Sequence, residues 1–269
     1  MARRGWNGTT FEITKGMGPA VVLIHGLGLN RQSWQWQVPA LARRYRVVTY
    51  DLFGHGDACD PPEAPSLALF AAQLAGLLDH LQIQKAAVLG FSLGGMIARR
   101  FAMDHQSRLW ALGILHSAHC RDGVAQEAVE ARAHQARTDG PAATAEAALR
   151  RWFSDAYRLR NPEMMDLVRG WILANRSGVY ADIYQVLAGG VSELVKPRPA
   201  ISAPSLVMTG DEDHGNSPEM SSAIAAEIPG SSLVILNGLR HMAMAEAPDV
   251  FNAELLSFLD RVAPSANQP

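Results

Sequence analysis

A serine between glycines is the strongest chemical signal in this sequence. Ser92 lies in the segment 90–95 (GFSLGG), which follows a strand-like apolar run at 86–90 and precedes a helical pattern at 93–105. A sharp strand-to-helix turn exposes such a serine above the sheet, and glycines at 90 and 94 leave room for the adjoining backbone. The pattern predicts that Ser92 is a nucleophile on this turn. The alternative is a chance Gly-x-Ser-x-Gly in a loop.

A nucleophilic serine needs a base, because its hydroxyl is a weak nucleophile at neutral pH. On such a turn the acid and then the base follow the serine along the chain. His241 comes five residues after a strand-like run at 232–236, in a loop ahead of a helix, where its ring can reach the edge of the sheet. His214 ranks below it because it stands beside the acid candidates and not after the final strand. We therefore expect His241 to be the base.

The base in turn needs an orienting acid. The strand-like run 205–209 is followed by Gly210 and three carboxylates, Asp211, Glu212 and Asp213. Aspartates also cap turns, so a solvated turn is the alternative for all three. The spacing alone leaves the choice among them open.

Two backbone amides are candidates for an oxyanion hole, which must aim N–H groups at the charge that develops on a carbonyl oxygen. The amide of Leu93 follows Ser92 at a helix N-terminus, and that of Leu27 lies in the loop 25–30 after the run 20–24. A nucleotide-binding loop is disfavoured there, because neither a third glycine nor a Gly-Lys-Ser/Thr follows the Gly-x-Gly.

Strand-like runs alternate with helical periodicity along most of the chain. Continuous apolar strands are typical of a parallel sheet that is covered on both faces. The order predicts an α/β fold with a mostly parallel, doubly wound sheet. The expected strands are 20–24, 45–50, 86–90, 109–115, 205–209 and 232–236, and the expected helices are 67–82, 93–105, 218–228 and 247–262.

The segment 121–196 breaks this alternation. It has no strand-like run and its pattern predicts three or four helices, at about 124–138, 142–154, 162–175 and 179–190. We expect a helical cap (lid) over the carboxyl edge of the sheet, where α/β proteins bind ligands. Residues 1–120 and 197–269 then form the core domain.

These motifs resemble the α/β-hydrolase fold family over essentially the whole chain. The matching blocks are 25–26 (HG), 51–56 (DLFGHG), 90–95, 210–213 and His241 ahead of 246–248. In that family the acid lies three residues after the strand-ending glycine, which implies Asp213 rather than Asp211, and the cap follows the sixth strand of the family's sheet. The chain departs from the family at Phe53 and Ala58, where arginine and serine are usual. We expect the loss of that arginine to alter the anchoring of the loop.

The cap resembles that of the 3-oxoadipate enol-lactonase and carboxylesterase group, through 151–157 (RWFSDAY), 161–162 (NP) and Trp171. Candidate pocket residues are Trp34, Trp152, His119 and Met242, although tryptophans in helices are more often core. His119 belongs to 116–120 (HSAHC), whose spacing also suits a metal, but we favour pocket lining at the sheet edge. Nine arginines against ten acids over 121–195 do not indicate an anion pocket.

The composition excludes several classes of protein. Lys and Arg number 24 against 26 Asp and Glu, without long blocks of one sign, so nucleic-acid and anionic-membrane partners are not expected. Two cysteines build neither a disulfide framework nor a zinc site, and we find no secretory pattern and no run of about 20 apolar residues. We expect a cytoplasmic protein with a small-molecule substrate and no metal or organic cofactor; a homo-oligomer stays open.

The expected function is that of a serine hydrolase that cleaves a small carboxylic ester or lactone through an acyl-enzyme. Dehalogenases and epoxide hydrolases on this scaffold are disfavoured, because they have aspartate where Ser92 stands. Carbon-carbon bond hydrolases and cofactor-free perhydrolases use the same triad and stay open. A hydrolase-like small-molecule receptor is the non-enzyme alternative.

Overall fold

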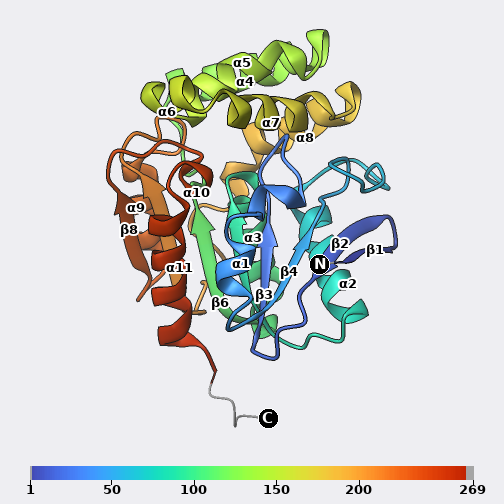
Figure 1. Ribbon diagram of the computed structural model, residues 1–269, viewed down its shortest axis with the longest axis vertical. Coiled ribbons are helices and arrows are strands. Elements are labelled where there is room, and N and C mark those ends of the chain that lie inside the picture. Colours follow the sequence, from blue (N-terminus) through green and yellow to red (C-terminus); the bar gives the residue numbers. More distant parts are fainter. Residues whose placement is uncertain (1, 265–269) are drawn as a thin grey trace.

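An eight-stranded sheet forms the centre of the computed structural model, which describes residues 2–264 (Figure 1). The strand order is β1-β2-β4-β3-β5-β6-β7-β8, with antiparallel pairing from β1 through β2 to β4 and parallel pairing elsewhere. The expected α/β architecture with a mostly parallel sheet is confirmed. The strands are β1 Ala2–Trp6, β2 Thr9–Ile13, β3 Ala20–Ile24, β4 Arg46–Tyr50, β5 Ala86–Phe91, β6 Leu109–Leu115, β7 Ser205–Gly210 and β8 Ser232–Leu236.

The hairpin of β1 and β2 is an addition to the six expected strands. Its turn consists of Asn7 and Gly8, which have φ values of 44° and 76°. Positive φ at both central residues is typical of the tight turns that match the twist of a hairpin. The hairpin extends the sheet beyond β4 with two antiparallel strands.

Helices cover both faces of the sheet, as the alternation along β3 shows. Val22 and Ile24 belong to a core with residues of α2, α3 and α9, whereas Val21 and Leu23 belong to a second core with residues of α1 and α11. The sheet is therefore doubly wound. These helices are α1 Val38–Leu41, α2 Leu67–His80, α3 Leu93–Asp104, α9 Pro218–Glu227, α10 Ala243–Glu246 and α11 Pro248–Val262, with short 3₁₀ turns at Arg31–Trp34 and Gln106–Arg108.

Five α-helices between β6 and β7, here called the cap helices, lie together beyond one end of the sheet (Figure 1). They are α4 Gly123–Asp139, α5 Ala142–Trp152, α6 Asp155–Arg160, α7 Pro162–Leu173 and α8 Ser177–Gly189, followed by a 3₁₀ turn at Gly190–Glu193. Four match expected helices, and α6 is additional. It begins after Ser154, whose hydroxyl accepts a hydrogen bond from the Tyr157 amide. Within residues 2–264, none of the helices combines the length and apolarity that crossing a membrane requires.

Candidate active site

Ser92 occupies the turn between β5 and α3. Its φ of 57° and ψ of −117° are values that residues with a side chain seldom adopt, so the turn holds backbone strain. Its amide donates a hydrogen bond to the carbonyl of Leu115 at 2.8 Å, and its carbonyl accepts one from the Ser117 hydroxyl at 3.0 Å. These bonds to β6 and the residues after it hold Ser92 at the carboxyl edge of the sheet.

Two glycines make this turn possible. A Cβ at Gly90 would lie 2.0 Å from the carbonyl oxygen of Gly94, and a Cβ at Gly94 would lie 2.3 Å from that of Ile24. Backbone atoms cannot move aside as a flexible side chain can. The expected need for glycine at both positions is confirmed.

Asp213 follows β7 and is buried among five hydrogen-bond donors, one of which is the Thr209 hydroxyl, 3.5 Å from Oδ2. Its Oδ2 accepts from Nδ1 of His241 at 2.7 Å and from Nδ1 of His116 at 2.9 Å, while Oδ1 accepts from the amides of Gly215 and Asn216 at 3.2 and 3.1 Å. Burial alone would raise the pKa of Asp213, but the charges and hydrogen bonds of the two histidines hold that pKa well below its usual range. The side chain is therefore an ionised acceptor.

The tautomer of His241 follows from this arrangement. Because an ionised carboxylate only accepts, Nδ1 of His241 carries its hydrogen and Nε2 is left to accept a proton. The ring stacks obliquely against Phe91 and Trp152, with centroid separations of 4.8 and 5.8 Å. It lines the same cavity as Ser92.

The other acid and histidine candidates have different contacts. Asp211 accepts hydrogen bonds from the amides of Gly238 and Leu239 at 2.7 and 3.3 Å. Glu212 lies 3.4 Å from Arg240, and His214 is exposed. None of these three candidates lines the cavity that contains Ser92.

The amides of Leu27 and Leu93 lie close to Ser92. Leu93 is the first residue of α3, where amides have no partner inside the helix. Leu27 lines the cavity, and a Cβ on the preceding Gly26 would lie only 3.1 Å from Cβ of Ser92. Within residues 2–264 neither amide has a hydrogen-bond acceptor. Both suit an oxygen that gains negative charge.

Two buried histidines fix the loop that carries Leu27. Nε2 of His55 accepts a hydrogen bond from the Gly28 amide at 3.1 Å, and Nε2 of His25 accepts one from the Leu52 amide at 3.0 Å. Burial lowers the pKa of His25 to about 4 and that of His55 to about 3, so both rings stay neutral acceptors at neutral pH. The loops after β3 and β4 therefore hold each other.

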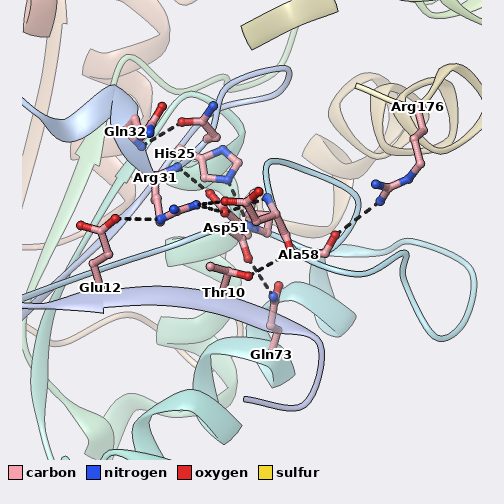
Figure 2. Close-up of polar contacts among 12 residues, drawn as sticks. Thr10, Glu12, His25, Arg31, Gln32, Asp51, Ala58, Gln73 and Arg176 are labelled. Atoms are coloured by element: carbon pink, nitrogen blue, oxygen red, sulfur yellow. Dashed lines mark hydrogen bonds and ion pairs between the residues drawn. The ribbon is translucent and has the colours of Figure 1, made fainter. Parts of the chain in front are cut away.

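Arg31 adds an ionic anchor between the same loops (Figure 2). Its amide donates to Oδ1 of Asp51 at 2.8 Å, and its guanidinium pairs with Oδ2 of Asp51, with Asp57 at 2.9 Å and with Glu12 at 3.1 Å. The absence of arginine at position 53 was expected to alter the anchoring of this loop. Phe53 is buried, and the guanidinium comes instead from the neighbouring loop.

One cavity contains Ser92, Asp213, His241 and Leu27. The space that the centre of a water-sized sphere can reach inside it is about 70 Å³, which is room for roughly five waters. Its other walls come mainly from the cap: Arg121, Val129, Arg132, Thr144, Ala148, Arg151, Trp152, Tyr180, Tyr184 and Leu187, with Gly215 and Asn216 from the loop after β7.

The four expected pocket residues lie in different places. Trp152 lines the cavity. Trp34 and Met242 are completely buried in the core, and Nε2 of His119 lies 3.2 Å from Glu227. These last three do not line the cavity.

Three arginines on the cavity wall were not expected, and the neutral composition of the cap was misleading. The cap acids do not line the cavity, whereas Arg121, Arg132 and Arg151 do. The helical spacing of the lining residues is a signal for this wall that the sequence does contain. Residues 144, 148 and 151 share one face of α5, and residues 180, 184 and 187 share one face of α8. The sequence alone does not say that these faces meet Ser92.

The cap helices are tied directly to the loop of His241. The amide of Met242 donates to the carbonyl of Trp152 at 2.8 Å, and the amide of Ser154 donates to Glu246 at 3.1 Å. The hydroxyl of Ser154 also donates to Glu246. The junction of α5 and α6 is thereby fixed next to His241.

His116, Asp213 and His241 form the one group of three potential metal ligands within residues 2–264, with ligand atoms less than 4.8 Å apart. Both histidine Nδ1 atoms lie at hydrogen-bond distance from one carboxylate oxygen. A metal ion there would have to displace both donated hydrogens. We therefore interpret the group as a hydrogen-bonded array.

Comparisons with known proteins agree with this fold. The family model for the alpha/beta hydrolase fold matches residues 19–248. The 3-oxoadipate enol-lactonase 2 of Acinetobacter baylyi is 29% identical over 90% of this chain and 89% of its own length.

Two solved structures are also similar. The enol-lactonase from Burkholderia xenovorans LB400 superposes with a TM-score of 0.87 at 29% identity, covering 96% of this chain and 100% of that one. A thermophilic esterase from Thermogutta terrifontis, solved with malate bound, has a TM-score of 0.85 at 30% identity, covering 95% of this chain and 94% of that one. Because the family model matches most of the chain and the sheet has the same architecture, this protein belongs to the α/β-hydrolase fold family.

Proposed function

We propose that this protein is a serine hydrolase that cleaves a small carboxylic ester or lactone, with Ser92 as nucleophile, His241 as base and Asp213 as its orienting acid. The observation that carries the proposal is the convergence of these three residues on one cavity, with Asp213 2.7 Å from Nδ1 of His241. A strained serine that shares a cavity with a histidine of defined tautomer suits acyl transfer.

In the proposed reaction, Oγ of Ser92 attacks the carbonyl carbon while Nε2 of His241 takes the hydroxyl proton. The carbonyl oxygen becomes an oxyanion that accepts hydrogen bonds from the amides of Leu27 and Leu93. Asp213 stabilises the imidazolium that forms, because its carboxylate already accepts from Nδ1.

The tetrahedral intermediate then breaks the bond to the leaving oxygen, which takes the proton from His241. This leaves an acyl group on Ser92. Water attacks the acyl-enzyme, His241 takes a proton from that water and returns it to Oγ of Ser92, and the acid is released. With a lactone, the leaving hydroxyl stays attached to the acyl group and one product leaves at the end.

The size of the cavity supports a small substrate. The space of about 70 Å³ beside Ser92 suits a short acyl group and not a long lipid chain. The activities in the names of similar proteins, enol-lactonase and esterase, fall in the same reaction class. A cytoplasmic location stays a prediction.

Labelling and turnover test the proposal together. A fluorophosphonate should modify one serine, identified as Ser92 by mass spectrometry, and p-nitrophenyl acetate should be hydrolysed over many turnovers. His241→Ala should lower kcat by roughly 10⁴-fold or more, whereas His214→Ala, a matched change at an exposed histidine, should not. Retained turnover in Ser92→Ala would contradict the assignment of the nucleophile.

A substrate panel tests the substrate class. We expect p-nitrophenyl esters of two to six carbons and five- or six-membered lactones to be preferred over chains beyond about ten carbons. Preferred cleavage of a vinylogous diketone would instead favour a carbon-carbon bond hydrolase. A single burst without turnover would favour a receptor.

A further inference from the structure

Three arginines face the cavity without an acidic partner. Arg121 precedes α4, Arg132 lies on α4 and Arg151 lies on α5, and all three line the cavity of Ser92. Asp213 is the one acid among the described lining residues, and its carboxylate already accepts hydrogen bonds from five donors. This wall of the cavity therefore carries uncompensated positive charge.

Several other cap arginines do have acidic partners. Arg137 pairs with Asp182 at 2.6 Å, and Arg169 pairs with Glu146 at 2.5 Å and with Asp166. Such exposed pairs are common on protein surfaces. No pair of this kind involves the three cavity arginines within residues 2–264.

Two of the cavity arginines are held by neutral groups. Arg121 donates to the carbonyls of Ala188 and Leu187 at 3.2 and 3.3 Å, and Arg151 donates to the carbonyl of Ala147 at 2.9 Å. These bonds fix the guanidinium groups without neutralising them. They leave two fixed positive charges on the wall.

Arg132 is different, because within the described chain its guanidinium has no hydrogen-bond partner. Its Nε is buried and unpaired. Burial lowers the pKa of Arg121 and of Arg151, and the neighbouring charge of Arg132 lowers both further. A guanidinium does not lose its proton in proteins, so an anion is the ligand that would stabilise these three neighbouring groups together.

We propose that Arg132, flanked by Arg121 and Arg151, binds a carboxylate of the substrate, so that the substrate is an ester or lactone that also carries a carboxylate. This inference deepens the proposed function, on which it rests for the identity of the bond cleaved. The planar guanidinium of Arg132 can bind a carboxylate through two parallel hydrogen bonds. The small cavity requires a short chain between that carboxylate and the carbonyl that Ser92 attacks.

Paired substrates and variants test this specificity. The substrates are the mono-p-nitrophenyl ester of glutaric acid and its neutral glutaramate counterpart, which differ only in carboxylate against carboxamide. We expect kcat/KM to favour the anionic ester by about 30-fold, as one charge-assisted hydrogen-bonded contact allows. Arg132→Met should bring the ratio close to one through a higher KM for the anionic ester, and Arg132→Lys should keep part of the preference.

Arg137→Met is the matched control, since it removes an arginine from the same helix at a site paired with Asp182. It should leave both rates and their ratio unchanged. Equal kcat/KM for the two esters in the wild-type chain would overturn the inference. So would an equal loss of preference in Arg137→Met and Arg132→Met.

A binding measurement separates this inference from the catalytic one. Glutarate should bind to Ser92→Ala in calorimetry, glutaramide should bind much more weakly, and Arg132→Met should abolish the difference. Glutarate binding without any esterase activity would leave the anion site standing and reject the proposed reaction. Esterase activity without glutarate binding would reject the anion site and keep the proposed reaction. Tighter binding of inorganic phosphate than of glutarate would overturn the assignment to a carboxylate.

Discussion

Replacing Asp213 with asparagine gives the sharpest test of the site, because the hydrogen bonds around this side chain dictate the outcome. Oδ1 accepts from two backbone amides, of Gly215 and Asn216, and Oδ2 accepts from Nδ1 of His241 and of His116. The amide oxygen of asparagine can replace only one of these oxygens. It should face the backbone amides, whose positions are fixed, and its NH₂ should then face the histidines.

The NH₂ group reverses the tautomer of His241. A donor opposite Nδ1 requires that Nδ1 accept, so the hydrogen moves to Nε2 and the base can no longer take the proton of Ser92. Loss of the carboxylate also removes the charge that stabilises the imidazolium. A wrong tautomer in a catalytic triad costs about 10⁴ in kcat in the serine protease that serves as the general template. We expect a loss of that order in Asp213→Asn, with KM changed little.

Asp211→Asn is the matched control. Asp211 is exposed and its Oδ1 accepts from the amides of Gly238 and Leu239, a role that the oxygen of asparagine can keep. Activity should therefore stay within about twofold of wild type. The assay is p-nitrophenyl acetate turnover, with near-UV circular dichroism to show that both variants fold. A greater loss in Asp211→Asn than in Asp213→Asn would refute this reasoning.

Three further predictions follow from buried groups around the site. His116→Phe should fold, because the ring stacks on Phe251 and its Nε2 is buried without a partner. It should move the acid limb of the kcat/KM pH profile to higher pH, because Oδ2 of Asp213 loses one donor and becomes a stronger acceptor for His241. Burial lowers the pKa of His25 to about 4 and that of His55 to about 3 in the folded protein. The stability that these neutral rings contribute is therefore full above the unfolded pKa of about 6.5 and is lost as the pH falls towards the folded values. The free energy of unfolding measured in urea should be lower at pH 5 than at pH 7 by about 2 kcal/mol for each histidine. Gly94→Ala should destabilise the fold by about 1–3 kcal/mol or more in the same assay, because its Cβ meets the backbone oxygen of Ile24.

The core of the fold was predictable because its signals are local. Runs such as 20–24 and 109–115 are apolar throughout, and a strand buried on both faces needs nothing else to specify it. The strained Ser92 turn was equally local, since Gly90 and Gly94 stand within two residues of it. The N-terminal hairpin has a local signal as well, the Asn7-Gly8 pair of its turn.

The cavity could not be predicted in the same way, because it depends on how distant helices pack. Trp34 and Trp152 looked alike in the sequence, yet one lies in the core against Phe91 and the other beside His241. The balance of charge in the cap was equally uninformative. Only the packing shows that Arg132 lines the cavity and that the cap acids do not.

Arg31 shows why a missing motif residue is a poor guide to a missing contact. The loop after β4 needs a cation beside Asp51, whose carboxylate is completely buried, because an unpaired buried charge is costly. Here Arg31 supplies that cation from the loop after β3 (Figure 2). Arg31 also lies four residues from Leu27 in the same loop. The ion pair with Asp51 and the hydrogen bond from Gly28 to His55 together restrain the amide that we propose stabilises the oxyanion.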